Sequence, residues 1–362
     1  MAPRRNTSID FVEYLQFDLV MIIMSLPDDP IDIIRASVVS RAWHHFVINN
    51  SFLKNLCIKK APAISTIDSV MVQEDGALTI IDYRSRHPLT FEILKKDHIM
   101  YSYLLEALSK SSIAPSDAVE CVVGASSTQS YPEESVVNVV LPSINYSWGD
   151  SYWSSTGCHD RNVPEKIMFK LYGDVCIVTE IEIQPFQRLD HQVYSANSVR
   201  LRMGHPKSYN DLRPNVESLP FREINDDNYV WTYTSPEFPM LEEASLQSFC
   251  LPEPALCIGG YLLIELLGRA QKDPINGLYY ICLGHVRILG HWLLPAFDIE
   301  MGLSGSISLK YHPNAVEDAL DFLPYDDEEN EDEEFFDLVD SEEDRPMLVV
   351  QLENMINIRR FE

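Results

Sequence analysis

Eight short apolar runs separated by turn residues occupy the chain between residues 116 and 290. They are 118–124, 136–141, 166–171, 175–185, 198–203, 246–251, 261–267 and 279–289, with Pro, Gly and Asn between them. Short runs at this spacing are typical of strands in an antiparallel sandwich or barrel. Ile181 and Ile183 alternate with acidic residues, as in a strand with one face in solvent. The sequence therefore predicts a β-sandwich over 116–290.

The first sixty residues have a helical spacing instead. A first element carries apolar residues three and four positions apart, at Leu15, Leu19, Ile22, Ile23 and Leu26, and ends at Pro27. Asp29 can cap a second helix, because Pro30 occupies the first helical position, where an N–H is not needed. A third element has one apolar stripe, formed by Val39, Trp43, Phe46 and Val47. We expect a small three-helix module over 10–60.

The remaining segments have weaker signals. Residues 61–115 are interpreted as a partly helical connector, since 97–111 is amphipathic, and 291–316 as an extension of the sandwich. Residues 317–345 are acidic and are expected to be disordered, and 346–362 form a C-terminal apolar segment. The predicted fold class is thus α+β multidomain: helices, connector, antiparallel sandwich and acidic tail. With 362 residues, the chain is long enough for more than one domain.

The charge distribution bears on the partners. The chain has 28 Lys and Arg against 55 Asp and Glu, a formal net charge of −27. Sixteen of the acidic residues lie between Glu317 and Asp344, where there is no Lys or Arg, so the rest of the chain carries 39 acids and 28 bases. A field of this sign repels phosphates, so we expect no nucleic-acid partner.

The seven cysteines are scattered, odd in number and form no CxxC pair. This usage favours a reducing compartment, and we expect the protein in the cytoplasm, the nucleus or both. Acidic residues break up the N-terminal region, so it lacks the uninterrupted apolar stretch of a signal peptide. No run approaches the ~18 apolar residues of a membrane span either, so we expect no membrane partner.

No strong catalytic signature is present. Gly302–Ser306 lacks the Gly-Lys-Ser/Thr ending of a phosphate-binding loop and is interpreted as a turn. His44 and His45 are neighbours that diverge on a helix, so they cannot share one metal ion with ordinary geometry. Cys158-His159-Asp160 is interpreted as a loop, because adjacent residues do not form a nucleophile and base pair. We therefore expect no catalytic residue, no metal, no cofactor and no enzymatic activity.

The segment Leu15–Lys54 resembles an F-box, the three-helix module that docks on the Skp1 adaptor of cullin-RING ubiquitin ligases. Leu26-Pro27, Asp32–Arg35 and Val39-Ser40-Arg41-Ala42-Trp43 match its pattern, whereas Gln16 replaces its usual proline and Ser40 its common cysteine. The resemblance implies a Skp1-type adaptor and, through it, a cullin as partners. It assigns adaptor binding to ten residues: Leu15, Asp18, Leu19, Ile23, Leu26, Pro27, Ile33, Ile34, Val39 and Trp43.

A second resemblance covers about half the chain. Gly124–Ser127, Tyr152–Gly157, Pro164-Glu165 and Ile181–Phe186 look like the discoidin or galactose-binding-like jelly roll. The whole chain is similar to a plant group of F-box proteins that joins the two modules. Trp153 is interpreted as core, because a buried Trp contributes a large apolar area whatever the function. Six residues are candidates for an exposed recognition rim: Tyr146, Trp148, Tyr152, Arg161, Tyr194 and Arg202.

These resemblances imply a substrate-recognition subunit of a Skp1-cullin-F-box ubiquitin ligase, in which the sandwich binds an unknown target protein. One alternative is a glycan-binding F-box receptor with a lectin-like jelly roll, and another is a scaffold without ligase function. A glycosidase with paired carboxylates ranks below them, because the prominent acids lie on strand faces or in the tail.

Overall fold

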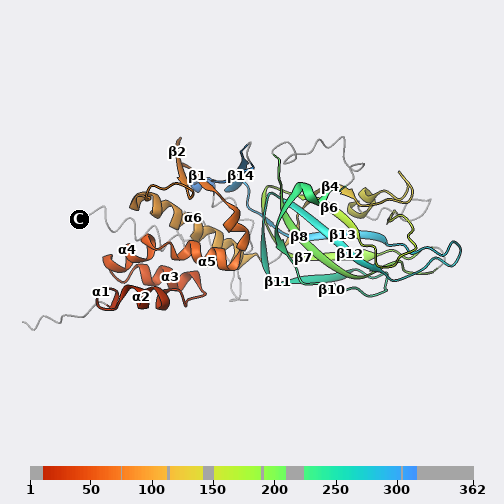
Figure 1. The fold of residues 1–362 in the computed structure, drawn as a ribbon, viewed down its shortest axis with the longest axis horizontal. Coiled ribbons are helices and arrows are strands. Elements are labelled where there is room, and N and C mark those ends of the chain that lie inside the picture. Colours follow the sequence, from red (N-terminus) through yellow and green to blue (C-terminus); the bar gives the residue numbers. More distant parts are fainter. Residues whose placement is uncertain are drawn as a thin grey trace, which may run out of the picture.

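The computed structural model describes residues 11–74, 76–111, 115–141, 151–188, 191–208, 224–302 and 305–315. A helical unit lies at one end of an elongated molecule and a β-sandwich at the other (Figure 1). The fold class is confirmed, since helices come first and antiparallel sheets follow. The predicted disordered segment 317–345 and the apolar segment 346–362 lie outside the described residues.

Five helices make up the N-terminal module: α1 (Phe11–Tyr14), α2 (Phe17–Met24), α3 (Pro30–Ser37), α4 (Arg41–Asn49) and α5 (Phe52–Lys60). The predicted start of α3 is confirmed, because the Asp29 side chain accepts a hydrogen bond from the Ile31 N–H at 2.8 Å and Pro30 follows it. The first predicted element is divided in the structure. Gln16 is the N-cap of α2, so α1 and α2 are separate helices.

A four-stranded sheet completes the helical unit. It consists of β1 (Ser69–Glu74), β2 (Ala77–Asp82), β14 (Phe297–Met301) and β15 (Ile307–Tyr311), in the order β14-β15-β1-β2. β1 and β15 are parallel neighbours, so a segment more than two hundred residues away in the chain pairs with the start of the connector. Helix α6 (Phe91–Lys110) packs against this sheet and α5. The predicted connector and extension therefore belong to one folded unit.

A buried polar cluster fixes the end of β2 to α5 and α6. The Tyr83 hydroxyl donates a hydrogen bond to the Asp97 carboxylate and lies 3.2 Å from the Tyr101 hydroxyl. The Lys54 ammonium lies 2.9 Å from the centre of the Tyr83 ring. Burial raises the pKa of the Asp97 carboxyl and lowers the pKa of Lys54, because both charged forms lose water.

Two antiparallel sheets form the sandwich. The strands are β3 (Ser116–Asp117), β4 (Val119–Ala125), β5 (Trp153–Ser154), β6 (Glu165–Leu171), β7 (Val175–Pro185), β8 (Ala196–Pro206), β9 (Tyr229–Thr234), β10 (Phe238–Pro239), β11 (Gln247–Ile258), β12 (Tyr261–Arg269) and β13 (Cys282–Trp292). One sheet has the order β10-β8-β12-β6-β4 with β9 paired to β8, and the other has β11-β7-β13-β3 with β5 paired to β13. Their inner faces enclose the sandwich core, which includes Trp153, Phe169 and Ile181.

One predicted strand is wrong, and four strands of the sandwich lie outside the eight predicted runs: β3, β5, β9 and β10. The run 136–141 is a 3-10 helix over Val136–Val140, which Ser135 caps by accepting from the Val137 N–H at 3.4 Å. Val136 and Val139 are three residues apart and both buried, as this helix requires. The spacing of apolar residues did not reveal β9, whose residues are mostly half-buried.

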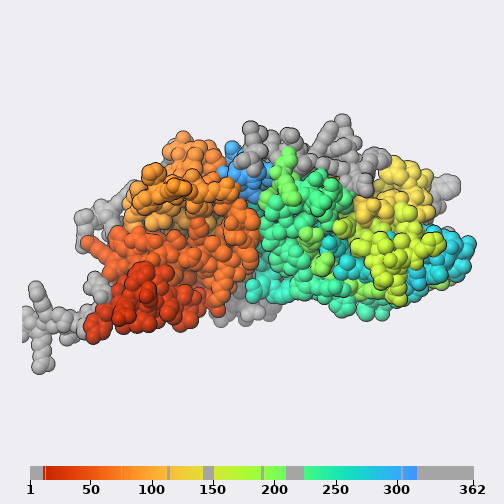
Figure 2. Space-filling model, in the orientation of Figure 1, coloured from red at the N-terminus to blue at the C-terminus, as the bar shows by residue number. Residues whose placement is uncertain are grey.

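One end of the sandwich packs into the core of the helical unit, and the rest of the sandwich has a separate core. Val175, Ile177, Leu256, Ile258 and Leu293 of the sandwich belong to the same buried cluster as the helices and the four-stranded sheet. Their surfaces meet directly in the space-filling view (Figure 2). The two units are therefore held in one arrangement by apolar contacts.

Membrane-spanning helices and clustered metal ligands are both absent from the described residues. No helix in these ranges combines the length and the apolar character that crossing a membrane requires. No group of three or more His, Cys, Asp or Glu side chains in the same ranges is arranged to hold a metal ion.

Candidate functional site

Helix α2 is apolar on its solvent side. Four large side chains at positions i, i+3, i+4 and i+7 are exposed by 42% to 70%: Leu19, Ile22, Ile23 and Leu26, of which Leu26 lies just after the C-cap Ser25. The opposite side is also apolar, because Val20 and Met24 are buried in the core. A helix with large apolar side chains on its solvent side as well as on its core side is expected at an interface. We call these four residues the α2 face.

Other exposed apolar residues lie nearby in the sequence. Tyr14 of α1 and Phe17 at the start of α2 are 73% and 59% exposed, and the turn between α3 and α4 exposes Val38 and Val39. Helices α1 to α4 lie at the end of the molecule opposite the free end of the sandwich (Figure 1). An exposed apolar surface at this end is suited to bind a protein partner.

The ten residues assigned to adaptor binding have different environments. Asp18, Leu19, Ile23, Leu26 and Val39 are exposed, and Leu15, Pro27 and Trp43 are half-buried. Ile34 is 0% exposed and belongs to the helical core, so for this residue direct contact is corrected to a supporting role, whereas Ile33, 2% exposed, lines the pocket described below. Ile22, Val38 and Phe17 were not assigned, although the helical spacing already placed Ile22 beside Leu19 and Leu26.

Trp43 fixes the first helix to the module. Its ring centre lies 4.9 Å from that of Phe11 in α1. The ring centres of Phe17 and Phe46 lie 5.8 Å apart in an edge-to-face arrangement, which joins α2 to α4. The Phe17–Phe46 contact holds the α2 face against α4. The Phe11–Trp43 contact is needed to hold α1, because a helix of four residues is not stable alone.

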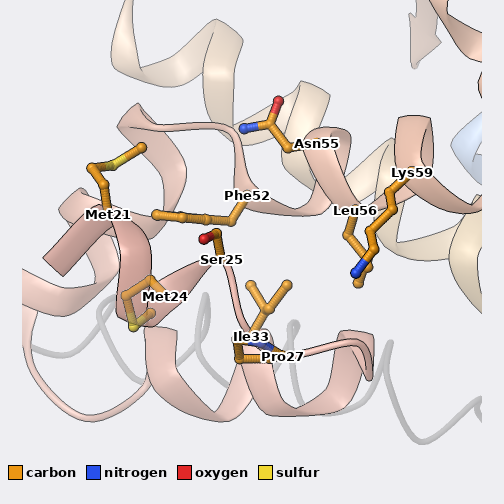
Figure 3. Close-up of a pocket in the computed structure, with 9 residues that line it drawn as sticks. All are labelled: Met21, Met24, Ser25, Pro27, Ile33, Phe52, Asn55, Leu56 and Lys59. Carbon is orange, nitrogen blue, oxygen red and sulfur yellow. The ribbon is translucent and has the colours of Figure 1, made fainter. Parts of the chain in front are cut away.

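A pocket of about 190 Å³ opens beside the α2 face. Its lining is mostly apolar and comes from α2, the turn after it, α3 and α5: Met21, Met24, Ser25, Pro27, Ile33, Phe52, Asn55, Leu56 and Lys59. Figure 3 shows Met21 and Met24 on one side, with Leu56 and Lys59 on the other. Lys59 forms an ion pair with Asp28 and lowers the pKa of that carboxyl. The pocket has the size and chemistry to receive an apolar side chain.

The sandwich has a second candidate surface at the end farther from the helices. Tyr152 and Phe186 are stacked there, with ring centres 4.1 Å apart and planes at 5°. The Tyr152 hydroxyl donates to Glu134 at 2.6 Å, and burial, with the nearby carboxylate, raises its pKa. The Arg188 guanidinium lies 5.4 Å from the centre of the Tyr194 ring. We call this group the loop-end cluster.

The predicted rim residues that the structure describes do not form one surface. Tyr152 and Tyr194 both belong to the loop-end cluster, but Tyr194 is 0% exposed, so its assignment to an exposed rim is wrong. Arg161 is exposed. Arg202 lies on β8, over the Trp231 ring and 3.3 Å from Asp226, so its guanidinium makes contacts within the sheet. Tyr146 and Trp148 lie outside the described residues.

Arg269 organises the loop end, and the sequence analysis did not identify it. Its guanidinium is buried and forms an ion pair with Glu165. It also donates to the Ser155 hydroxyl at 3.0 Å and to the carbonyls of Thr156 and Tyr279. The Trp153-Ser154-Ser155 motif thus supplies a buried core residue and a partner for this arginine. Trp153 is 0% exposed, as its interpretation as core requires.

These observations define a class of protein: a helical module with an exposed apolar face, joined through a shared core to a jelly-roll sandwich. The chain is 41% identical over 308 residues to F-box protein At4g00755 of Arabidopsis thaliana, a match that covers 81% of this chain and 79% of that protein. The chain therefore belongs to the F-box protein family. A scan against protein-family models found no match.

The chain is also similar to solved carbohydrate-binding modules. The family 32 module of Clostridium perfringens NanJ, solved in complex with galactose, is 12% identical, with a TM-score of 0.29, covering 51% of this chain and 96% of that one. The family 32 module of Streptococcus pneumoniae EndoD is 11% identical, with a TM-score of 0.31, covering 48% of this chain and 98% of that one.

Proposed function

We propose that the protein is a substrate-recognition subunit of a Skp1-cullin-F-box ubiquitin ligase. The N-terminal helices bind a Skp1-type adaptor and, through it, a cullin, while the sandwich binds a target protein. We propose that it acts in the cytoplasm, the nucleus or both. Membership of the F-box family and the exposed apolar surface of α1–α4 support the proposal.

The α2 face carries the adaptor part of the proposal. Leu19, Ile22, Ile23 and Leu26 expose large apolar area to water, and each contributes about 1 kcal/mol or more when an interface covers it. The neighbouring pocket adds shape complementarity to the interface, because it can receive one apolar side chain of the adaptor. The rim of this surface carries both charges, since Asp28 pairs with Lys59 and Asp32 pairs with Arg35.

The shared core supports the receptor part. A ligase subunit of this kind acts by proximity, since it raises the effective concentration of target lysines at the ubiquitin carrier. Five sandwich residues in the helical core keep the two units in one arrangement. A target bound at the sandwich is thereby held at a defined position relative to the adaptor, and the protein itself needs no nucleophile.

Co-purification with Skp1 tests the adaptor part. We expect the intact chain to retain Skp1 and the double variant Ile22→Glu, Leu26→Glu to lose it, because two carboxylates would have to be desolvated in the interface. Leu241→Glu is the matched control, since Leu241 is equally exposed, at 58%, but lies in the sandwich. Circular dichroism establishes that each variant is folded. Failure of the folded intact chain to bind Skp1 would overturn the proposal.

Reconstituted ubiquitination separates a receptor from a scaffold. A target that binds residues 116–290 should be ubiquitinated when the intact chain, Skp1, cullin and the ubiquitin carrier are present. The Ile22→Glu, Leu26→Glu variant should still bind the target but should not support its modification. A target that binds and is never modified by the complete assembly would favour the scaffold.

Glycan recognition is a second candidate, and the loop-end cluster favours it. Half-buried Tyr152, stacked on Phe186, lies beside the Glu134 carboxylate and near Arg188, so a ligand there would meet an aromatic ring next to charged hydrogen-bonding groups. A glycan array with the intact chain tests it. Specific binding that Tyr152→Ala abolishes would support a glycan-binding receptor. Binding that persists in this variant would place the glycan elsewhere.

A further inference from the structure

A pocket of about 360 Å³ lies at the junction of the helical unit and the sandwich. The helical unit contributes the end of α5 and the start of the 3-10 helix η1 (Pro62–Thr66), and the sandwich contributes β9 and β11. The lining residues are Lys59, Lys60, Ala61, Pro62, Ala63, Thr232, Tyr233, Pro252, Glu253, Pro254, Ala255 and Leu256. α5 and β11 lie on the two sides of this junction in Figure 1. We call this site the junction pocket.

The junction pocket has the size and the place of a binding site. Its volume is in the range of about 300 to 1,000 Å³ that ligand pockets usually have, and such pockets often lie between domains. Its most buried lining residues are apolar and mostly small, so their short side chains leave space above them: Ala61, Ala63, Ala255 and Leu256. The base of the pocket is therefore suited to an apolar group.

Prolines make the walls of the junction pocket stiff. Pro62 follows α5, and Pro252 and Pro254 lie in β11, where a shift of register with β7 sets this part of the strand outside the regular ladder. Each proline has a fixed φ and no N–H to satisfy. A site with stiff walls loses little conformational entropy when a ligand enters it.

Two charged side chains without partners stand at the rim. Lys60 comes from α5 and Glu253 from β11, and both are exposed. In the part of the chain that the structure describes, neither forms an ion pair or a hydrogen bond, with the other or with any third residue. Lys59 differs, because its ammonium is paired with Asp28. Burial and the Glu253 carboxylate raise the pKa of Tyr233, so this hydroxyl lies near the acidic side of the rim.

We propose that the junction pocket binds a short extended segment of the target protein, in which an apolar side chain lies between an acidic and a basic residue. This inference rests on the proposed function, in which the sandwich binds a target. The acidic residue pairs with Lys60, the basic residue pairs with Glu253, and the apolar side chain fills the base. A ligand with one charge would meet a like charge at the rim, whereas a peptide can carry both charges. An apolar centre with a charged rim is also the usual composition of a protein interface.

The place of the junction pocket suits a receptor. Lys59 lines both this pocket and the pocket beside the α2 face, so a bound target segment lies close to the adaptor-binding surface. The apolar contacts between the two units hold Lys60 and Glu253 at a fixed separation. Opposite charges at a fixed separation select the direction of the bound segment as well as its composition.

Fluorescence anisotropy of labelled peptides with the intact chain tests the charge pattern. The probes are acetylated and amidated peptides in which one to three residues, with Leu, Val or Phe at the centre, separate Glu from Arg in either order. Peptides with Glu at both ends or Arg at both ends are the controls. We expect one order of opposite charges to bind about tenfold or more tightly than the controls, because each control brings two like charges together at the rim.

Charge exchange in the pocket tests the two rim residues. Lys60→Glu should weaken binding of the preferred peptide about tenfold or more. The double variant Lys60→Glu, Glu253→Lys should restore tight binding with the opposite order of charges in the peptide, which a protein that had lost its fold could not do. Lys272→Glu is the matched control, since Lys272 is exposed in the loop between β12 and β13.

Skp1 binding separates this inference from the proposed function. We expect the double variant to co-purify with Skp1 as the intact chain does, because neither residue belongs to the α2 face. Binding of none of the peptides, equal binding of all of them, or an unchanged order of charges in the double variant would overturn the inference and leave the adaptor part intact. A concentration-dependent dimer that Lys60→Glu abolishes would also overturn it, because a second copy would then occupy the pocket.

Discussion

At the scale of single residues, the departures from the F-box pattern have local explanations. Ser40 stands where the family commonly has cysteine, and its hydroxyl accepts a hydrogen bond from the Trp43 N–H at 3.2 Å, which caps α4. Gln16 stands in place of proline with φ at −60°, a value that proline itself adopts. Both substitutions therefore preserve the backbone of the module.

We predict that Ser40→Ala lowers the free energy of unfolding by about 1 kcal/mol, because the Trp43 N–H at the start of α4 loses its partner. Urea unfolding followed by circular dichroism measures the change. Ser65→Ala is a suitable control, since the Ser65 hydroxyl donates to a carbonyl in an exposed turn and caps no α-helix. Equal stability of Ser40→Ala and the intact chain would contradict this role of Ser40.

His98 makes the stability depend on pH. It is 5% exposed inside α6, and burial, together with nearby His44, lowers its pKa to about 3. Between this value and the ~6.5 of an unfolded histidine, only the unfolded chain binds the proton. The contribution of neutral His98 to the free energy of unfolding is therefore complete above about pH 6.5 and falls as the pH decreases from ~6.5 toward 3.

We predict that His98→Phe reduces the dependence of unfolding free energy on pH between 7 and 5, by up to about 1.4 kcal/mol per pH unit, the effect of one proton. Chemical unfolding at several pH values measures the slope, which is informative even if the larger ring changes stability at neutral pH. His159→Phe, at an exposed position, is the matched control. An unchanged slope in His98→Phe would show that other groups cause the pH dependence.

At the scale of elements, the helical module depends on strands from the other end of the chain. Phe297, Ile299 and Met301 of β14 are buried in the helical core, as are Ile307, Leu309 and Tyr311 of β15. β15 also supplies the parallel partner of β1. Without these two strands, β1 would become an edge and the core would lose six large side chains.

We predict that a chain ending at residue 296 loses the ordered structure of the helical unit while the sandwich strands up to β13 remain. Proteolysis followed by mass spectrometry should show rapid cleavage in 11–110 and protection of 116–290. The chain ending at residue 316 is the control, and we expect its helical unit to resist cleavage. Equal resistance of both chains in 11–110 would contradict the dependence on β14 and β15.

At the scale of the whole molecule, the core of the helical unit extends into the adjacent end of the sandwich. Leu256 and Ile258 of β11 are 2% and 0% exposed and pack with the helical unit, as does Leu293 after β13. Domains joined by a small polar interface can move relative to each other, whereas a buried apolar junction couples them. This coupling is the physical basis for presenting a target at a defined position.

We predict a single calorimetric unfolding transition for the intact chain, because neither unit can unfold without exposing the shared core. Ile258→Ala should lower stability by about 2 to 5 kcal/mol and should begin to separate the transitions of the two units. Ile264→Ala, which removes an equally buried side chain in the sandwich core alone, should destabilise without separating them. Two transitions in the intact chain would show that the units are independent.

The sequence alone determined the features that depend on near neighbours. The Asp29 and Pro30 start of α3, the apolar spacing of α2 and the alternation in β7 are local patterns, since capping and periodicity act within a few residues. The sequence motifs also indicate the F-box and the jelly roll, because each motif lies within a short segment of the chain.

The tertiary structure decided what depends on residues distant in the chain. An apolar pattern does not reveal which side meets the core, so Ile33, Ile34 and Tyr194 are buried although they were assigned to contacts. The valine run at 136–140 is a 3-10 helix because its burial against β4 and β13 suits a three-residue spacing. The pairing of β15 with β1 joins segments that no local signal connects, and this non-local contact unites the helical unit.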